Sequence, residues 1–341
     1  MFKDANLRRN AAGIAMRSSA KWAAAIVTAA SLVGVVGLMA RPVAAKDLTF
    51  GYVVASQVYP FNASTAKGFE DAAKEKGVKT IVLDPQGSVE KQGNALDDLI
   101  VQKVDAIGFL PIESMTSQSF VDKVDAAGIP VVACCAQVGD ATQDVRDVYK
   151  GLNAAVLPDE VAFGEASGKL AAELVPKDKT IKLAIVEGPG GFAGVEKRTR
   201  GFKAGLDAAG IKYEIVGAQP TDWTPERGEA VCQNFLAANP DIDLIFSQAD
   251  DMALGCARAL DAVGSKAILV ATFGGSKLGN QAIKDGEIDA SICVKPGTLG
   301  RLMFESMYAA ATGANTKKGQ VVLLDPLPVT KDTLDKCVAE W

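Results

Sequence analysis

Short apolar runs alternate with amphipathic segments along most of the chain. Residues 48–54 read LTFGYVV, residues 79–84 KTIVLD and residues 105–110 DAIGFL, and helical patterns at 64–76 and 89–102 separate them. Continuous apolar strands of this length, separated by amphipathic helices, are typical of a parallel sheet that helices cover on both faces. The pattern therefore predicts an α/β fold built on a doubly wound parallel sheet.

The alternation pauses at an irregular stretch over 137–153 and then resumes. Before it, a helix is expected at 117–126 and a strand at 129–135. After it, the pattern predicts a helix at 158–175 and then five strands with helices between them, at 181–186, 213–217, 243–247, 267–271 and 289–294.

The two halves of the chain share landmarks in the same order. The pair GF at 68–69 precedes a glycine at 77, and the pair GF at 201–202 precedes a glycine at 210, an offset of 133. Further matches follow at offsets of up to 138. Such glycines permit the left-handed end of a helix before the next strand. The repetition predicts two similar lobes, with a ligand cleft facing the carboxyl ends of their strands.

The first 45 residues have the pattern of a secretory signal peptide. Five Lys and Arg residues lie within the first 21 positions, an uncharged apolar run covers 22–40, and Val43-Ala44-Ala45 provides small residues before a cleavage point at Lys46. We expect cleavage there and export to the periplasm. The alternative is an uncleaved membrane anchor, because the run is long enough to span a bilayer marginally.

Charge and composition exclude several function classes. The 1–45 segment holds six basic residues and one acidic residue, so its removal changes the formal net charge from −5 to −10. A chain this acidic, without a basic stripe, is not expected to bind nucleic acid or an anionic membrane. The absence of histidine excludes His-dependent nucleophiles and His-ligated zinc, and no cofactor or metal is expected. It also predicts that binding varies little between pH 6 and 8.

All six cysteines follow the signal segment, where export permits disulfides. Six thiols allow fifteen complete pairings, and sequence does not choose among them. Cys232 and Cys256 fall on consecutive predicted helices and are the best candidate pair. The adjacent Cys134 and Cys135 would close a strained ring. Burial as small hydrophobic residues is the alternative for all six.

Several longer motifs carry a family resemblance: PFNASTAKGFEDAAKEKG at 60–77, DAIGFLP at 105–111, ANPDIDLIFSQADDMALGCARAL at 238–260 and FGGSKLGNQAIKDGEIDASI at 273–292. With them, the chain from Leu48 to about Val329 resembles the ribose-binding-like (type I) periplasmic solute-binding proteins of ABC transporters. The resemblance implies two lobes joined by a three-segment hinge. The crossovers are expected near 150–153, 294–297 and 323–326, which gives an N-terminal lobe of 46–150 plus 297–325 and a C-terminal lobe of 151–296 plus 326–341.

The resemblance also implies a function. A sugar, polyol or related small solute would close the two lobes around itself, and a membrane ABC permease would recognise the closed form. No catalytic residue is implied, and a monomer is expected. Sugar-binding members stack aromatic rings on the sugar and clamp its hydroxyls with polar side chains. The candidate ligand-binding residues by position are Gln57, Tyr59, Phe61, Asn62, Glu113, Asn153, Phe192, Arg198, Asp222, Trp223, Asp250, Phe273 and Lys295.

The sequence departs from the family pattern at four expected polar positions. Cys135 and Ala136 stand where the branch often has Asp-Arg, Ala249 stands for an Asn, Gly274 for an Asp, and Val294 for a Gln or Asp. Unmatched buried polar groups are costly, so the loss of four of them changes which solute fits. A smaller polyol or a less hydroxylated solute than a pentose or hexose is the expectation.

The sequence leaves three alternatives to this function. The loop GPGGFA at 188–193 fits the dinucleotide fingerprint, with Glu214 ending the next strand, and would suit an NAD-dependent oxidoreductase. Export, the absence of histidine and the missing amide of Pro189 count against it. A sugar-responsive repressor needs an N-terminal DNA-binding helix pair, where this chain has an apolar signal. A ligand-binding module for a chemoreceptor remains open.

Overall fold

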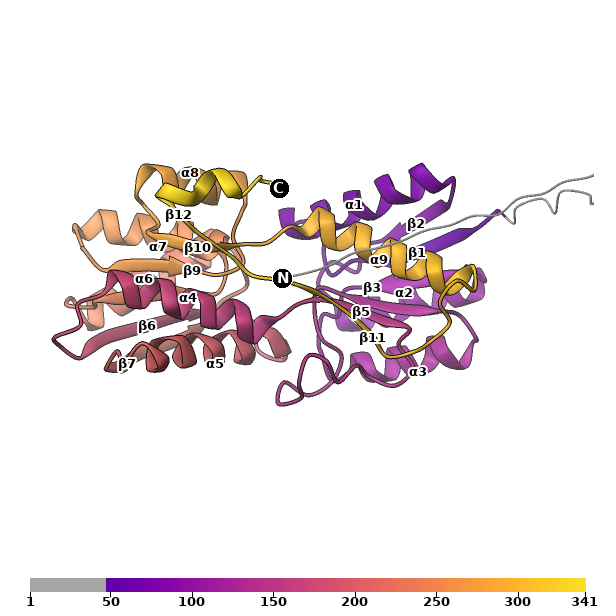
Figure 1. Cartoon of the computed structure of the whole chain (residues 1–341), viewed down its shortest axis with the longest axis horizontal. Helices are drawn as coiled ribbons and strands as arrows, with labels where there is room; N and C mark the ends of the chain where they lie inside the picture. Colours follow the sequence, from indigo (N-terminus) through magenta and orange to yellow (C-terminus); the bar gives the residue numbers. More distant parts are fainter. Residues whose placement is uncertain (1–46) are drawn as a thin grey trace, which may run out of the picture. The chain divides into compact units, whose positions relative to one another are not determined.

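A computed structural model describes residues 47–341, and the predicted signal segment lies outside the described residues. These residues form two six-stranded sheets with helices on both faces (Figure 1). In the first lobe, the strand order is β11-β5-β4-β3-β1-β2. The strands are β1 (Thr49–Val53), β2 (Lys79–Leu83), β3 (Ala106–Phe109), β4 (Val131–Cys134), β5 (Ala154–Pro158) and β11 (Gln320–Leu324). The helices are α1 (Pro60–Lys76), α2 (Val89–Val101), α3 (Ser117–Ala126) and α9 (Pro296–Ala311).

The second sheet has the order β12-β10-β9-β8-β6-β7, which repeats the first order strand for strand. This confirms the fold class predicted from the shared landmarks. The strands are β6 (Ile181–Glu187), β7 (Tyr213–Pro220), β8 (Leu244–Ser247), β9 (Ile268–Ala271), β10 (Ala290–Cys293) and β12 (Leu327–Thr330). The helical elements are α4 (Glu160–Leu174), α5 (Ala193–Ala208), α6 (Pro225–Ala238), α7 (Asp250–Val263), α8 (Lys277–Asp285) and the 3₁₀ helix η1 (Lys331–Lys336).

The helix ends follow local sequence signals. The side chains of Ser88 and Thr224 accept hydrogen bonds from the backbone amides three residues further on, which caps the first turns of α2 and α6. Gly77 ends α1 with a φ of 68°, and Gly264 ends α7 with a φ of 66°. These left-handed positions suit glycine and let the chain turn directly into the next strand.

The first crossover lies further along the chain than the expected 150–153. Residues Ala154–Pro158 form β5 and pair in parallel with β4, so they belong to the first lobe. The chain enters the second lobe at α4, whose N-cap is Asp159. The strand was missed because AAVLP follows an irregular stretch and contains small residues and a proline, which weaken the strand signal.

The other two crossovers join β10 to α9 and β11 to β12. Strand β11 is parallel to β5, whereas β12 is antiparallel to β10. A chain that leaves the first sheet at its carboxyl edge and enters the second sheet at its carboxyl edge must run against the strands of the second sheet. The carboxyl ends of both sheets therefore face the space between the lobes (Figure 1).

Each sheet is buried on both faces. Helices α1 and α9 cover one face of the first sheet, where the rings of Phe50 and Phe69 both pack against Phe304. In the second lobe, Phe202 of α5 and Phe246 of β8 stack with ring centroids 3.9 Å apart. Burying each such ring contributes about 1.5–3 kcal/mol to stability. Within residues 47–341, no helix is long and apolar enough to cross a membrane.

Candidate functional site

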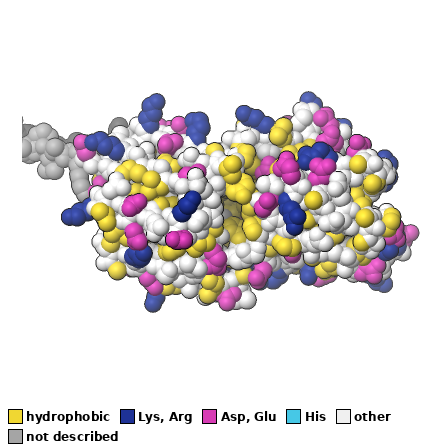
Figure 2. Space-filling model, turned by 180° about the vertical axis from the view of Figure 1, so that it is seen from behind, with side chains coloured by type: hydrophobic (Ala, Val, Ile, Leu, Met, Phe, Trp, Pro, Cys, Tyr) yellow, Lys and Arg dark blue, Asp and Glu magenta, His cyan; other side chains and the backbone are white. Residues whose placement is uncertain are grey.

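A cavity of about 210 Å³ lies between the lobes, at the carboxyl ends of the strands of both sheets. In the space-filling view, hydrophobic side chains gather in the hollow between the two halves of the molecule (Figure 2). The first-lobe wall comes from the loops after β1, β2, β3 and β4, and the second-lobe wall from α5 and the loops after β6, β7, β8 and β9. This is where open α/β sheets bind ligands.

The first-lobe wall is almost entirely apolar. Its lining includes Leu110, Pro111 and Ile112 after β3, and Cys135 after β4. Its polar members, Ser56 and Asn62, are buried, and the Asn62 side-chain amide donates to the Ser56 carbonyl at 2.9 Å. That bond holds the loop after β1 against the start of α1. The wall therefore offers the cavity shape and C–H contact more than hydrogen bonds.

Arg198 is the central polar residue of the second-lobe wall. It is buried, and its Nε and Nη2 donate to the two carboxylate oxygens of Glu160, at 2.6 and 3.1 Å. Its Nη1 donates to the Gln248 carbonyl at 3.0 Å, and the guanidinium carbon lies 3.4 Å from the ring centre of Phe273. Arginine has five N–H donors, and these bonds use three of them. Because Glu160 balances its charge, Arg198 brings directed donors to the cavity without net charge.

Asp250 lies beneath the second-lobe wall and does not line the cavity. One of its carboxylate oxygens accepts from Ser291 Oγ at 2.8 Å and the other accepts from the Gly275 amide at 3.0 Å. A Cβ on Gly274 or Gly279 would collide with these oxygens. Glycine at these two positions therefore makes room for the carboxylate of Asp250. Burial raises the pKa of Asp250 to about 7.

Asp251 is the acidic residue that lines the cavity. Its side chain makes no hydrogen bond or ion pair with another residue in 47–341, and burial raises the pKa of its carboxyl to about 6. The expectation that binding varies little between pH 6 and 8 rested on the absence of histidine alone, and these carboxyls are further titratable groups to be counted. The chain has no histidine, but burial moves the pKa of two carboxyls, at positions 250 and 251, to the edge of that range or into it.

The five aromatic candidates all line the cavity: Tyr59, Phe61, Phe192, Trp223 and Phe273. Phe192 and Trp223 meet edge to face at 6.0 Å, and Phe61 lies 6.3 Å from Phe273. Trp223 and Phe273 have φ angles of 69° and 52°, a backbone conformation that side-chain-bearing residues rarely adopt. Such positions persist only where the surroundings hold them, and they cluster at binding sites.

The structure brings seven of the sequence candidates to the cavity and places six elsewhere. Asn62 and Arg198 line it with the five aromatic residues. Glu113 accepts from the amides of Met115 and Thr116 at the start of α3. The other five outside the lining are Gln57, Asn153, Asp222, Asp250 and Lys295. Asn153 accepts a hydrogen bond from the Val131 amide, and Asp222 accepts one from the Thr224 amide. Gln57 is exposed, Asp250 is buried, and Lys295 directly precedes α9.

Of the lining residues that were not among the candidates, Asp251 is the charged residue and Trp341 the aromatic residue. The loop after β8 indicated an acidic residue, but a choice between adjacent aspartates depends on the helical phase of α7, which sequence fixes only loosely. Trp341 comes after the last regular element and had no sequence signal of its own. The only sequence rule that bears on these two residues is that the carboxyl ends of the strands meet at the cleft.

Three disulfides are formed within the described residues, Cys134–Cys135, Cys232–Cys256 and Cys293–Cys337. The pair between α6 and α7 confirms the best sequence candidate. The ring between the neighbours Cys134 and Cys135, one of the pairings that the sequence left open, is closed, and Cys135 has a left-handed backbone (φ 69°) at the end of β4. Cys135 therefore presents a disulfide, and no polar group, to the cavity.

The glycine-rich loop at 188–193 connects the lobes. The amide of Ser114 donates to the Gly191 carbonyl at 3.1 Å, and the Ala193 amide donates to Ser114 Oγ at 3.1 Å. The ring of Trp223 occupies the space where a Cβ on Gly188 would stand. The amide at the start of α5 is thus already bound by the first lobe, where a dinucleotide pyrophosphate would need it. No cluster of metal-ligating side chains occurs within 47–341.

A duplicated α/β fold with a cavity between its lobes defines a two-lobed binding protein. The chain belongs to the periplasmic binding protein family, whose domain description matches residues 50–315. It is 33% identical over 282 residues to the ribose import binding protein of Bacillus subtilis, covering 83% of this chain and 87% of the relative. It is 27% identical over 299 residues to the D-allose-binding periplasmic protein of Escherichia coli, covering 87% and 93%.

A solved structure gives the same result in three dimensions. A protein from Mycobacterium smegmatis in complex with β-D-fucofuranose has a TM-score of 0.75 and 26% identity. The match covers 85% of this chain and 93% of that one. The likeness therefore extends over both lobes and the segments between them.

Proposed function

We propose that the protein binds a small sugar or polyol-like solute in the cavity between its lobes and delivers it to a membrane ABC permease. The observation that carries the proposal is the cavity itself, which combines aromatic rings from both lobes with an unpaired carboxylate, Asp251. Sugar-binding sites pair C–H stacking with hydroxyl hydrogen bonds, and this cavity has groups for both. The names of the relatives, which bind ribose, D-allose and fucofuranose, support the class.

The hydrogen-bonding groups that line the cavity restrict the class of solute that fits it. Asp251 accepts hydrogen bonds, and Arg198 retains two N–H groups beyond those that hold Glu160 and Gln248. On the first-lobe wall, the Asn62 side-chain amide already donates to the backbone carbonyl of Ser56. A solute with many hydroxyls would leave several of them without partners against the first-lobe wall, at about 1–3 kcal/mol each. The cavity therefore favours a compact solute with few hydroxyls, which directs them at the second lobe.

Capture and release require only lobe closure. Contacts that exist when both walls touch the solute stabilise the closed form relative to the open form, so the solute shifts the population toward closed. The bonds of Ser114 to the loop at 188–193, and of the Tyr59 hydroxyl to the Asp222 carbonyl at 3.1 Å, form part of the same interface. No bond of the solute is made or broken in this scheme. The permease recognises the surface of the closed form. The 1–45 segment directs export to the periplasm, where the protein acts as a monomer.

The proposal is tested by a thermal-shift screen of residues 46–341 against sugars, polyols, amino acids and small organic acids. A solute that binds only the folded state stabilises it by about 2.7 kcal/mol at a hundred times its dissociation constant. We expect a polyol or sugar to give a concentration-dependent rise in Tm. Trp223→Ala should abolish that rise, while Tyr213→Ala, an aromatic truncation outside the cavity in the same lobe, should retain it.

Two outcomes would contradict the proposal. A response confined to amino acids or organic acids would move the protein to another solute class. Saturable binding of NADH, followed by its fluorescence, would support the oxidoreductase alternative for the loop at 188–193.

A further inference from the structure

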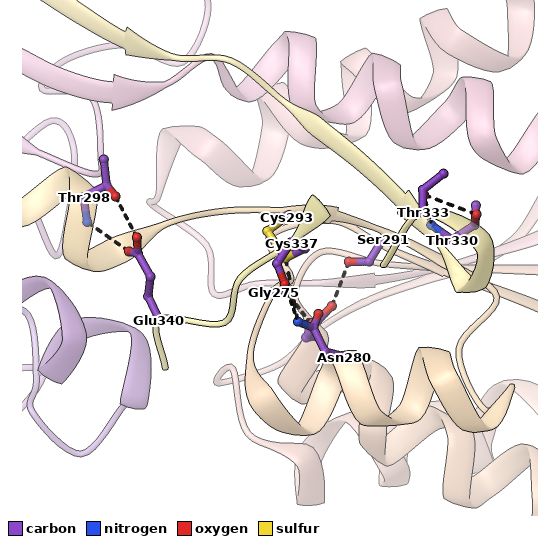
Figure 3. The surroundings of a disulfide bond; sticks show 10 residues. Gly275, Asn280, Ser291, Cys293, Thr298, Thr330, Thr333, Cys337 and Glu340 are labelled. Carbon is purple, nitrogen blue, oxygen red and sulfur yellow. Dashed lines mark hydrogen bonds between the residues drawn. A yellow bond between two sulfur atoms is a disulfide. The ribbon is translucent and has the colours of Figure 1, made fainter. Parts of the chain in front are cut away.

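Residues 337–341, which we name the strap, run from Cys337 on the second lobe past Thr298 at the start of α9 in the first lobe (Figure 3). On the second lobe, Cys337 forms a disulfide with Cys293 at the end of β10. The Asn280 side-chain amide donates to the Cys337 carbonyl at 3.1 Å, and the Lys277 amide donates to the Trp341 carbonyl at 2.8 Å. The strap is therefore fixed to the second lobe at both of its ends.

Glu340 fixes the strap to the first lobe. The amide and hydroxyl of Thr298 donate to its two carboxylate oxygens at 2.9 and 2.7 Å, and Ser64 Oγ donates to its backbone carbonyl at 2.9 Å. Thr298 lies in the first turn of α9, directly after the crossover from β10, and Ser64 lies on α1. The strap thus runs along the hinge and contacts an element on each side of it.

The strap ends in a side chain of the cavity lining. The indole of Trp341 lines the cavity and meets Phe61 edge to face, with ring centroids 5.6 Å apart and an interplanar angle of 90°. Phe61 in turn lies beside Phe273 of the second lobe. The indole therefore extends an aromatic row that begins in one lobe and ends in the other.

We propose that Trp341 is a solute-contacting, specificity-determining residue and that the disulfide-anchored strap is the device that positions it. The inference rests on the proposed solute capture. An indole has a large apolar face and few rotatable bonds, so it suits the C–H groups of a sugar or polyol. A five-residue segment without regular structure would lose much of that advantage if it had to be ordered upon binding. The disulfide and the Glu340 bonds order it in advance.

The mature chain offers a direct readout of this contact. Residues 46–341 contain two of the three tryptophans of the full sequence, Trp223 and Trp341, and both line the cavity; Trp22 lies in the predicted signal segment. In a Trp223→Phe variant of residues 46–341, all tryptophan emission comes from position 341. Titration with D-ribose, D-allose, xylitol and glycerol should change that emission for the probe that binds the wild type. Unchanged emission at saturation, verified by calorimetry, would overturn the contact.

Affinity measurements by isothermal titration calorimetry separate contact from positioning. With the probe that the wild type binds most tightly, Trp341→Ala should weaken affinity at least tenfold and Trp341→Phe less than threefold. The double substitution Cys293→Ser with Cys337→Ser should also weaken it, and adding Trp341→Ala to that background should cost less than it does alone. Val338→Ala, at an exposed strap position, is the matched control and should bind as the wild type does.

The results distinguish this inference from the proposed function. If the wild type binds a probe and Trp341→Ala binds it equally well, the strap inference fails and solute capture stands. If the wild type binds none of the four probes, both fail for this solute class. Full additivity of the disulfide and Trp341 substitutions would leave the contact and overturn the positioning role.

Discussion

The two walls of the cavity come from equivalent loops but differ in chemistry. Strands β4 and β9 hold the same place in their sheets, and each is followed by a lining residue with a left-handed backbone, Cys135 (φ 69°) and Phe273 (φ 52°). In the first lobe this residue is half of a disulfide ring. In the second lobe it is an aromatic ring under the guanidinium of Arg198. The duplicated fold fixes where the loops stand, and the side chains give one lobe shape recognition and the other polar recognition.

The largest expected effect is a loss of stability from a substitution in the polar second-lobe wall. Arg198→Ala leaves the buried carboxylate of Glu160 without its partner, and removing one member of a buried ion pair costs about 3–5 kcal/mol of unfolding free energy. For a chain of this size that lowers Tm by roughly 5–8 °C. Differential scanning calorimetry of the solute-free protein measures it. A Tm within 2 °C of the wild type would show that Arg198 does not organise this wall.

A second test compares disulfides in the two lobes. The Cys232–Cys256 bond closes a loop of sequence separation 24, which corresponds to about 3 kcal/mol of stability in the chain-entropy account. Replacing both cysteines with alanine should cost about that much in urea denaturation. Equal stability of this variant and the wild type would show that the bond constrains the unfolded chain little.

The third prediction concerns the polarity of the second-lobe wall. Burial raises the pKa of Asp251 in the empty cavity to about 6, and a bound hydroxyl that donates to its carboxylate lowers the pKa from that value. Affinity should therefore be full above pH 6 and lost as pH falls below it, by about tenfold between pH 7 and pH 5. Calorimetric titrations across this range measure it. Asp251→Asn should bind more weakly at pH 7 and show little pH dependence; a pH profile like that of the wild type would remove Asp251 from the site.

The smallest effect belongs to the first-lobe wall. Replacing Cys134 and Cys135 with serine opens a ring of adjacent residues, which constrains the unfolded chain very little, so stability should change by less than about 1 kcal/mol. Solute affinity should fall no more than about threefold, because this wall supplies contact and not hydrogen bonds. A loss of solute affinity as large as that of Asp251→Asn would show that the two walls do not differ in this way.

Sequence predicted the fold nearly completely, since strands β1 to β4 and β6 to β10 lie within or close to the predicted ranges. It missed β5, β11 and β12, which flank the hinge; β5 and β12 contain proline, which weakens a strand pattern, whereas β11 has an apolar pattern that was not assigned to a strand. Candidates read from the carboxyl ends of strands, such as Phe61 and Trp223, reached the cavity. Polar candidates did so less often, because side chains such as Asn153 and Asp250 satisfy local backbone groups, and local hydrogen bonding is set by packing that sequence spacing does not specify.

The central claim is that one solute binds between the first-lobe wall, which recognises its shape, and the second-lobe wall, which recognises its polar groups. Isothermal titration calorimetry of residues 46–341 with the sugar or polyol that gives the largest thermal shift tests it most directly. The account predicts one site per chain, with affinity lost in Asp251→Asn at pH 7 and nearly retained when Cys134 and Cys135 are both serine. Heat of binding that is absent for every sugar and polyol, or unchanged in Asp251→Asn, would contradict it.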